Sequence, residues 1–211
     1  MTRVVLGSAS AGRLRVLRQA GLDPLVLVSE VDEDALIASV DDDTPPEAVV
    51  AKLANAKAVA VAAQLPPEIA ADCIMLGCDS MLFHNDVLCG KPGSAEAARR
   101  QWVSMAGTTG YLLTGHALLR ITDGVIAHTD SETSSTAVHF GTPTDDELAA
   151  YIGSAEPVHV AGAFTLDGLG GWFIDKIEGD PSNVIGISLP LVRRMVRRAG
   201  MSITEIWGAS A

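Results

Sequence analysis

Short apolar runs alternate with longer amphipathic segments along this chain, and clusters of Gly, Pro and small polar residues separate them. Short apolar runs predict buried strands, whereas a repeat of three to four residues predicts helices. The predicted strands cover residues 3–7, 25–28, 73–78, 87–89, 111–121, 125–139, 158–166 and 172–177. The predicted helices cover residues 11–20, 45–64, 94–105 and 190–199, and one more begins after Thr144 and ends near Gly153.

Cap and turn signals support several of these boundaries. The Asp-Gly pair at 123–124 favours a tight hairpin between the two longest predicted strands. Thr144 and Glu147 have the spacing of a capping box, and Thr44 and Glu47 repeat that spacing at the start of an Ala-rich helix. Helix starts are therefore expected just after both threonines.

The remaining stretches are predicted to be irregular. Residues 32–43 are acidic and predict a loop, and the third strand is expected to stop at the polar pair 79–80. Glycines at 168–171 predict a second hairpin, and residues 179–186 predict a tight polar loop. Together the elements predict an α/β fold, a mixed twisted sheet with flanking helices, in one domain spanning residues 1–211.

Composition and charge narrow the classes of function. Hydrophobic residues make up 48% of the chain and charged residues 19%, which is typical of a folded core rather than disorder. The net charge of −11 argues against partners such as polymeric nucleic acid or an anionic membrane. No run of 18 apolar residues is present, so no membrane span is expected. A small anionic substrate stays compatible, because it needs only a local cationic pocket or a metal.

The cysteines indicate a reducing environment. The chain has three cysteines, Cys73, Cys78 and Cys89, and no two of them form a C-x-x-C pair. Neither a disulfide framework nor a zinc site is therefore expected. The N-terminal apolar stretch is too short for a signal peptide. We therefore expect a cytoplasmic protein.

Four polar spots lie where predicted strands end or tight turns begin, the usual places for a site in α/β proteins. At residues 8–13, a helix N-terminus with hydroxyls and an arginine can bind phosphate. At residues 77–80, a carboxylate after an apolar strand can act as a base or a metal ligand. At residues 90–92, a lysine between Gly and Pro can hold a phosphate group. Taken singly, each is explained at least as well by an ordinary cap, turn or loop. The spots are residues 8–13, 77–80, 90–92 and 179–186.

Two further charges lie between these spots. Glu33 is in the acidic stretch, and Lys57 is on the Ala-rich helix, five positions after Lys52. Five helical residues turn the side chain by about 140°, so the two lysines are expected to face different ways. The chain lacks the P-loop, the G-x-S-x-G elbow and the H-E-x-x-H spacing, which argues against those enzyme classes.

The ordered set of motifs resembles the Maf family, also called septum-formation inhibitor-like proteins, along nearly the whole chain. The motifs are Leu-Gly-Ser-Ala-Ser-x-x-Arg at 6–13, Val-Asp-Glu at 31–33, Ala-Lys-Ala at 56–58, Gly-Cys-Asp-Ser at 77–80, Gly-Lys-Pro at 90–92, Thr-Gly at 114–115, Glu-Pro at 156–157 with Ala-Gly-Ala-Phe at 161–164, and Gly-Asp-Pro-Ser-Asn-Val-Ile-Gly at 179–186. No single motif is specific, but their order is.

The resemblance implies a fold related to the inosine triphosphate pyrophosphatases, with two lobes around a cleft. It also implies hydrolysis between the α and β phosphates of non-canonical or pyrimidine nucleoside triphosphates, with Mg²⁺ or Mn²⁺. The implied catalytic residues are Asp79, Glu33, Lys57 and Lys91, of which Asp79, with Glu33 nearby, would hold the metal or activate the water. The residues expected to bind substrate are Ser8, Ser10, Arg13 or its neighbour Gly12, Ser80 and Asp167.

The sequence departs from the family pattern at two places. Residues 10–13 read Ser-Ala-Gly-Arg where the family usually has Ser-Pro-Arg-Arg, and Asp167 stands where a glutamine is common. Both lie where base selectivity is expected to be set, so the preferred base is open. An ionised Asp167 can only accept hydrogen bonds, and it would favour bases that offer an N–H donor.

Two other functions stay open at this point. One is a non-enzymatic regulator of cell division that binds a nucleotide or a partner protein, as the older family name suggests. The other is a sugar-nucleotide or phosphate-transferring enzyme that shares the anion-binding turn. The expected partner is a small nucleotide substrate, and a homodimer is an arrangement that the sequence leaves open.

Overall fold

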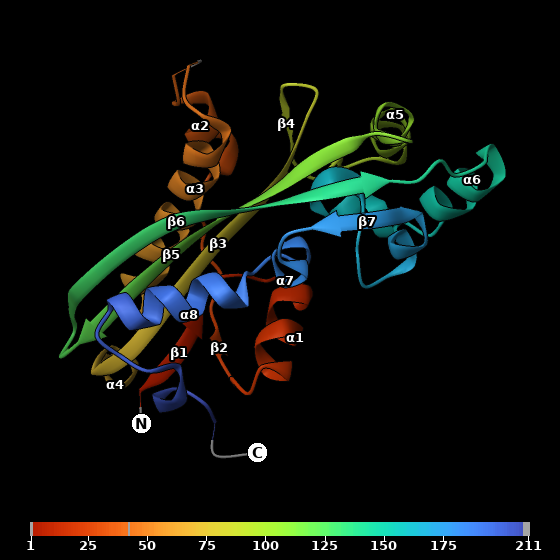
Figure 1. Cartoon of the computed structure of the whole chain (residues 1–211). Coiled ribbons are helices and arrows are strands. Elements are labelled where there is room, and N and C mark those ends of the chain that lie inside the picture. The colour runs from red at the N-terminus through yellow and green to blue at the C-terminus, as the bar shows by residue number, and fades with distance from the viewer. Residues whose placement is uncertain (1, 42, 209–211) are drawn as a thin grey trace. The chain divides into compact units, whose positions relative to one another are not determined.

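The computed structural model describes residues 2–41 and 43–208 (Figure 1). The chain forms two compact units, each assembled from separate stretches of sequence. The described parts of Met1–Asp79, Thr114–Ser134 and Gly186–Ala211 form the first unit, and Ser80–Leu113 with Ser135–Ile185 form the second.

A mixed sheet confirms the predicted α/β class. The strand order is β2-β1-β3-β5-β6-β7, and β4 pairs with β3. Along the chain, three long strands pass from one unit into the other: β3 (Asp72–His84), β5 (Thr109–Thr122) and β6 (Val125–Phe140). Residues 123 and 124, with φ of 51° and 76°, form the predicted Asp-Gly turn between β5 and β6.

In the first unit, β1 (Arg3–Leu6) lies parallel to both β2 (Leu25–Val26) and β3. The other elements of this unit are the helices α1 (Ala11–Gln19), α2 (Glu33–Ala38), α3 (Pro46–Ala62), α4 (Pro67–Ala70) and α8 (Leu189–Arg198), and the 3₁₀ turn η4 (Ile203–Glu205). Apolar side chains from α3, α4, β1, β3 and β5 pack into one cluster.

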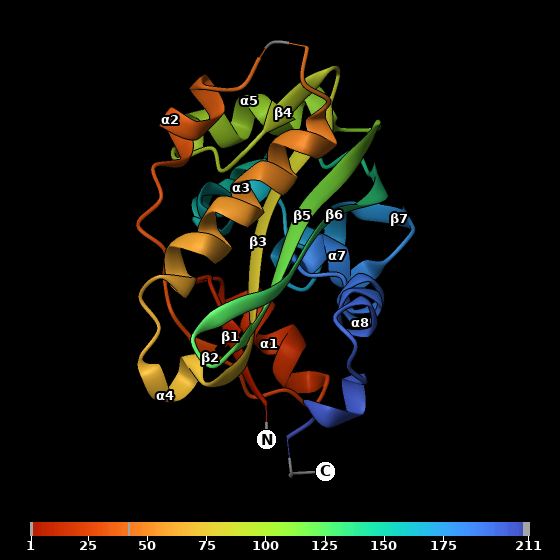
Figure 2. The ribbon, with the colours of Figure 1, turned by 90° about the vertical axis from the view of Figure 1, so that its left-hand side faces the viewer.

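Helix α3 lies unusually close to β3 and β5 (Figure 2). A Cβ atom added to Gly77 would lie 2.4 Å from the Ala54 carbonyl oxygen, and one added to Gly115 would lie 2.1 Å from the Val50 carbonyl oxygen. Both contacts are with helix backbone, which cannot rotate away as a side chain can. Only glycine therefore permits this approach.

The second unit is organised around aromatic side chains. Its further elements are β4 (Val87–Cys89), α5 (Ala95–Met105), α6 (Asp145–Gly153), the 3₁₀ turns η1 (Glu156–His159), η2 (Ala161–Ala163) and η3 (Leu169–Phe173), β7 (Ile174–Glu178) and α7 (Pro181–Ile185). The fully buried Trp102 meets Phe140, Tyr151 and Phe173 edge-on, and its indole N–H donates to the Ala163 carbonyl at 2.7 Å.

The two predicted capping boxes have different outcomes. Thr144 and Glu147 form the predicted box at the start of α6. Thr44 and Glu47 do not form one, because Pro45 is the N-cap of α3 and no side chain caps that helix. Pro46 is the first helical residue, so Thr44 lies one position too early to cap it.

Four predictions of irregular or strand structure were wrong. The acidic stretch 32–43, of which residue 42 lies outside the described residues, contains α2, capped by Asp32. Strand β3 does not stop at 79–80 but continues to His84. The hairpin expected across 158–177 is replaced by three 3₁₀ turns, since residues 162 and 163 have positive φ, and β7 pairs with β6 instead. The loop at 179–186 contains the short helix α7.

Among the described residues, no helix combines the length and the apolar character that crossing a bilayer requires.

Candidate active site

The centre of the candidate site is a lysine held between two carboxylates in the first unit. The Lys57 ammonium nitrogen lies 2.6 Å from Asp79 Oδ1 and 2.8 Å from Glu33 Oε1. Lys57 is 8% exposed and Asp79 is 6% exposed, whereas the Glu33 side chain is about half exposed. The structure thus brings together three residues that the sequence singled out separately.

Each of these side chains comes from a different element. Lys57 lies on the sheet-facing side of α3, while Lys52 on the same helix is exposed, which confirms their predicted difference in orientation. Glu33 is the first residue of α2, whose N-terminus is capped by the Asp32 side chain at 2.9 Å. Asp79 lies within β3, and its ion pair with Lys57 explains why a polar residue can occupy a buried strand.

The turn before α1 forms a second polar group in the same unit. Ser10 caps the nine-residue helix α1 by accepting a hydrogen bond from the Arg13 N–H, and Ser8 Oγ accepts one from the Ser10 N–H at 3.2 Å. The Arg13 guanidinium donates to Ser8 Oγ and to the Gly186 carbonyl, both at 2.8 Å. Arg13 is largely buried, so its contacts position the turn as well as supplying charge.

The two polar groups border the same buried thiol. Burial raises the pKa of Cys78 to about 11; the charges of Arg13 and Lys57 act against this shift, and the Asp79 carboxylate adds to it. All three charges therefore lie close enough to act on one sulfur atom. Strand β1, which leads into the Ser8–Arg13 turn, lies parallel to β3, which carries Asp79, and the Gly7 N–H donates to the Leu76 carbonyl at 2.8 Å, so the two polar groups lie at the same end of two paired strands.

The remaining predicted site residues belong to the second unit. Lys91 is exposed on a loop that is pinned at both ends, because the Gly162 N–H donates to the Gly90 carbonyl and the Gly93 N–H donates to the Val158 carbonyl, each at 3.1 Å. Ser80 is half-buried in β3, where it points to the opposite face from its neighbour Asp79.

Asp167 is exposed in the bend that precedes η3. It does not turn a β-hairpin, so the hairpin predicted from the glycines at 168–171 is wrong at this position.

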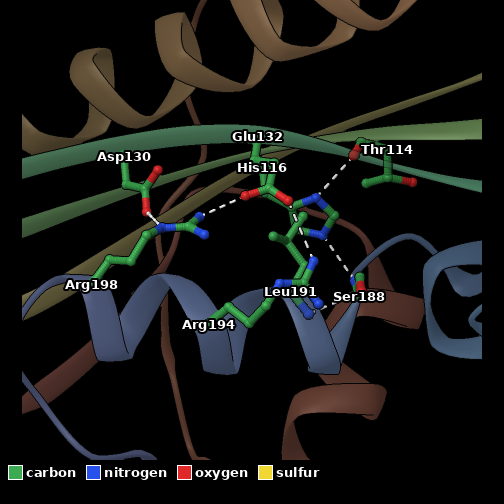
Figure 3. A network of polar contacts seen from close by, with 8 residues as sticks. All are labelled: Thr114, His116, Asp130, Glu132, Ser188, Leu191, Arg194 and Arg198. Atoms are coloured by element: carbon green, nitrogen blue, oxygen red, sulfur yellow. Dashed lines mark hydrogen bonds and ion pairs between the residues drawn. The ribbon is translucent and has the colours of Figure 1, made fainter.

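A buried histidine was missed by the sequence analysis. His116 is 1% exposed, and its Nε2 accepts a hydrogen bond from the Ser188 N–H at 2.8 Å, so Nδ1 carries the proton and donates to the Thr114 carbonyl at 2.9 Å (Figure 3). Ser188 in turn caps α8 through its hydroxyl. His116 thus links β5 to the start of α8, and no pattern in the sequence indicated this partner.

Ion pairs hold the other end of α8 to β6. Arg198 contacts Asp130 at 2.6 Å and Glu132 at 2.7 Å, and Arg194 contacts Glu132 at 3.3 Å (Figure 3). These groups lie on the partly exposed surface of the helix, so they support its position and take no part in the candidate site.

The donor set of the candidate site can be compared with the needs of a metal ion. Within residues 2–41 and 43–208, no three His, Cys, Asp or Glu side chains form a group that could hold a metal alone. Glu33 and Asp79 offer two carboxylates, and within the described part of the chain Asp79 Oδ2 takes part in no hydrogen bond or ion pair. Mg²⁺ is usually bound by one or two carboxylates together with substrate phosphates and water, so the two carboxylates fit that ion.

Comparison with known proteins agrees with this geometry. The chain matches the Maf-like protein family over residues 3–199. It is 72% identical over 207 residues to a protein of Mycolicibacterium gilvum, covering 98% of this chain and 99% of that protein. It is 70% identical to a protein of Mycolicibacterium vanbaalenii, with the same coverage, and 54% identical to one of Nocardia farcinica, covering 97% of this chain and 96% of that protein. All three are named nucleoside triphosphate pyrophosphatase. This chain therefore belongs to the Maf family.

Proposed function

We propose that this protein is a nucleoside triphosphate pyrophosphatase that releases pyrophosphate by hydrolysing the bond between the α and β phosphates. The family match and the names of relatives at 54–72% identity support this activity. The alternative of a non-enzymatic regulator is not favoured, because those relatives carry an enzyme's name. A cytoplasmic location, where nucleoside triphosphates are made and used, fits the proposal.

The single observation that carries the proposal is the lysine shared by two carboxylates. Asp79 keeps one carboxylate oxygen, Oδ2, outside the ion pair, and that oxygen can accept a hydrogen bond from an attacking water. Lys57 fixes the other oxygen, so the carboxylate is oriented before substrate arrives. Hydrolysis at phosphorus needs an oriented water and neutralised charge, and this cluster offers both.

The Ser8–Arg13 turn offers donors for a phosphate group. The N-terminus of α1 carries partial positive charge, and the hydroxyls of Ser8 and Ser10 stand at the same turn. Arg13 is a buried cation whose charge reaches the same region. We infer that these groups stabilise negative charge that develops on the polyphosphate.

Three further residues are assigned to substrate binding because of the resemblance to the family: Lys91, Ser80 and Asp167. Lys91 would contact a phosphate, and Ser80 and Asp167 would contact the base. Glu33 and Asp79 would hold a Mg²⁺ or Mn²⁺ ion, which when bound would supply charge neutralisation and a more acidic water. A homodimer stays a prediction.

A panel of standard and modified triphosphates tests the proposal. With Mg²⁺ or Mn²⁺ present, the wild type should release pyrophosphate and a nucleoside monophosphate; release of phosphate would favour a phosphate-transferring enzyme, and no turnover would favour a binding protein. Asp79→Asn should lower kcat by at least about a hundredfold, the scale of a lost general base. Asp86→Asn is the matched control, because Asp86 is exposed in the β3–β4 turn with a φ of 60° that asparagine tolerates.

A further inference from the structure

One carboxylate outside the candidate site organises a whole loop of the second unit. Glu156 Oε1 accepts hydrogen bonds from the Thr165 hydroxyl at 2.6 Å, from the Gly170 N–H at 3.0 Å and from the Tyr151 hydroxyl at 3.2 Å. Its Oε2 accepts one from the Leu169 N–H at 3.0 Å. These donors enclose residues 165–170, the loop that carries Asp167.

The loop is packed tightly against this carboxylate. A Cβ atom added to Gly168 would lie 2.6 Å from Glu156 Oε2 and 2.7 Å from the Thr165 hydroxyl. One added to Gly170 would lie 2.5 Å from the Tyr151 hydroxyl and 2.7 Å from the Thr165 backbone nitrogen. The glycines are therefore needed so that the backbone can wrap around Glu156 at hydrogen-bond distance.

The segment that begins at Glu156 also anchors the loop that carries Lys91. The Val158 carbonyl accepts from the Gly93 N–H, and the Gly162 N–H donates to the Gly90 carbonyl. Residues 156–162 thus tie together two loops of the second unit, each of which carries a residue of the proposed substrate site.

Glu156 itself is poorly suited to touch substrate. Its carboxylate already accepts four hydrogen bonds from protein groups, three at Oε1 and one at Oε2, and a carboxylate accepts about four in all. A general base or a metal ligand needs an oxygen that is not already engaged by protein donors. Asp79 has Oδ2 outside its ion pair, whereas both oxygens of Glu156 accept hydrogen bonds. The chemistry of Glu156 is therefore that of a support for the loop.

We propose that Glu156 is a positioning residue that sets base selectivity by fixing the loop at residues 165–170 and, with it, the side chain of Asp167. This inference rests on the proposed function. It assigns Glu156 a role in discrimination between triphosphates rather than in the hydrolytic step, so loss of its carboxylate changes which substrate is preferred more than how fast the best one reacts.

The test replaces Glu156 by glutamine, which keeps the shape of the side chain but removes its charge and replaces one acceptor oxygen by an –NH₂ group. That group cannot accept a hydrogen bond from the N–H and O–H donors around it. The matched control is Glu147→Gln, which removes another carboxylate that accepts a backbone N–H, in the capping box of α6. Thr165→Val is a second variant that removes the shortest of the four hydrogen bonds and no charge.

Three quantities are measured: kcat/KM for each triphosphate, Kd for non-hydrolysable triphosphate analogues, and amide hydrogen exchange across residues 165–170. In Glu156→Gln we expect exchange at Leu169 and Gly170 to accelerate and the ratio of kcat/KM between the two best substrates to change by about tenfold. The kcat for the best substrate should stay within about threefold. Thr165→Val should act in the same direction and less strongly, and Glu147→Gln should change neither the exchange nor the ratio.

Unchanged exchange in the loop, or faster exchange with an unchanged selectivity ratio, would overturn the positioning role. A selectivity change of the same size in Glu147→Gln would also overturn it, because any loss of a capping carboxylate would then suffice. A wild type that binds the analogues without hydrolysing any triphosphate would refute the proposed function, while the ratios of Kd would still decide the role of Glu156.

Discussion

Removing the Lys57 ammonium is the perturbation whose consequences follow most directly from the structure. The two ion pairs of Lys57 differ in burial: the Asp79 side chain is 9% exposed, whereas the Glu33 side chain is 51% exposed. Removing one partner of a buried pair costs about 3–5 kcal/mol, but an exposed pair contributes only about 0–1 kcal/mol. Because Asp79 Oδ2 lies outside the ion pair and can still accept a hydrogen bond, we expect the lower end, about 3 kcal/mol, for Lys57→Met.

A double-mutant cycle separates the two pairs. Denaturant unfolding of Lys57→Met, Asp79→Asn, Glu33→Gln and the two double variants gives each coupling energy. We expect about 2 kcal/mol between Lys57 and Asp79 and less than about 1 kcal/mol between Lys57 and Glu33. Lys52→Met, on the exposed face of the same helix, should change the free energy of unfolding by less than about 0.5 kcal/mol.

Activity supplies the second arm of the same test. If the Lys57 charge also stabilises the transition state, Lys57→Met should lower kcat/KM by about 3 kcal/mol, roughly 150-fold, while Lys52→Met should leave it unchanged. Equal couplings of Lys57 to Asp79 and to Glu33 would refute the reasoning from burial. A loss of activity in Lys52→Met as large as that in Lys57→Met would refute the assignment of the helix face.

Three other predictions follow from the packing and the pKa shifts. Gly77→Ala must push α3 away from β3, so it should lower the free energy of unfolding, measured by denaturant titration, by at least about 2 kcal/mol and should reduce turnover. At the control position Gly153 nothing lies within 4 Å of an added Cβ atom, so Gly153→Ala should change neither quantity. The Cys78 thiol, with its pKa raised to about 11, should resist iodoacetamide at pH 8 and react once the protein unfolds; rapid labelling of the folded protein would contradict this. Burial raises the pKa of Glu156, but its hydrogen bonds outweigh burial and hold the pKa below the ordinary 4.5. Protection of the Leu169 amide from hydrogen exchange, corrected for intrinsic exchange, should therefore persist above pH 4.5 and be lost as the pH falls through the lowered pKa. Protection that does not depend on pH would contradict this prediction.

Local signals in the sequence predicted the elements whose structure is decided locally. The Asp-Gly turn at 123–124 and the box formed by Thr144 and Glu147 depend on residues within three positions of each other. The opposite faces of Lys52 and Lys57 follow from helix periodicity alone. These features need no knowledge of the rest of the fold.

Contacts between distant residues explain what the sequence could not predict. Asp79 looked like the end of a strand because its partner, Lys57, lies 22 positions away, and only that partner lets a carboxylate remain in a buried strand. The Arg13 side chain reaches the Gly186 carbonyl, 173 positions along the chain. The glycines at 168–171 between two apolar runs predicted a hairpin, but four hydrogen bonds to Glu156 and the positive φ at residue 162 favour 3₁₀ turns.

The candidate site is also a product of the packing between α3 and β3. Residues two apart on a strand lie on the same face of the sheet, so Gly77 and the Asp79 side chain both face α3. Residues three and four apart on a helix share a face as well, so Ala54, Lys57 and Ala58 point toward β3. The missing side chain of Gly77 lets Ala54 and Ala58 approach the strand, and at that separation the Lys57 ammonium reaches the Asp79 carboxylate. A larger residue at Gly77, Ala54 or Ala58 would separate helix and strand, so the small residues that appear to serve only the core also determine whether the charged pair forms.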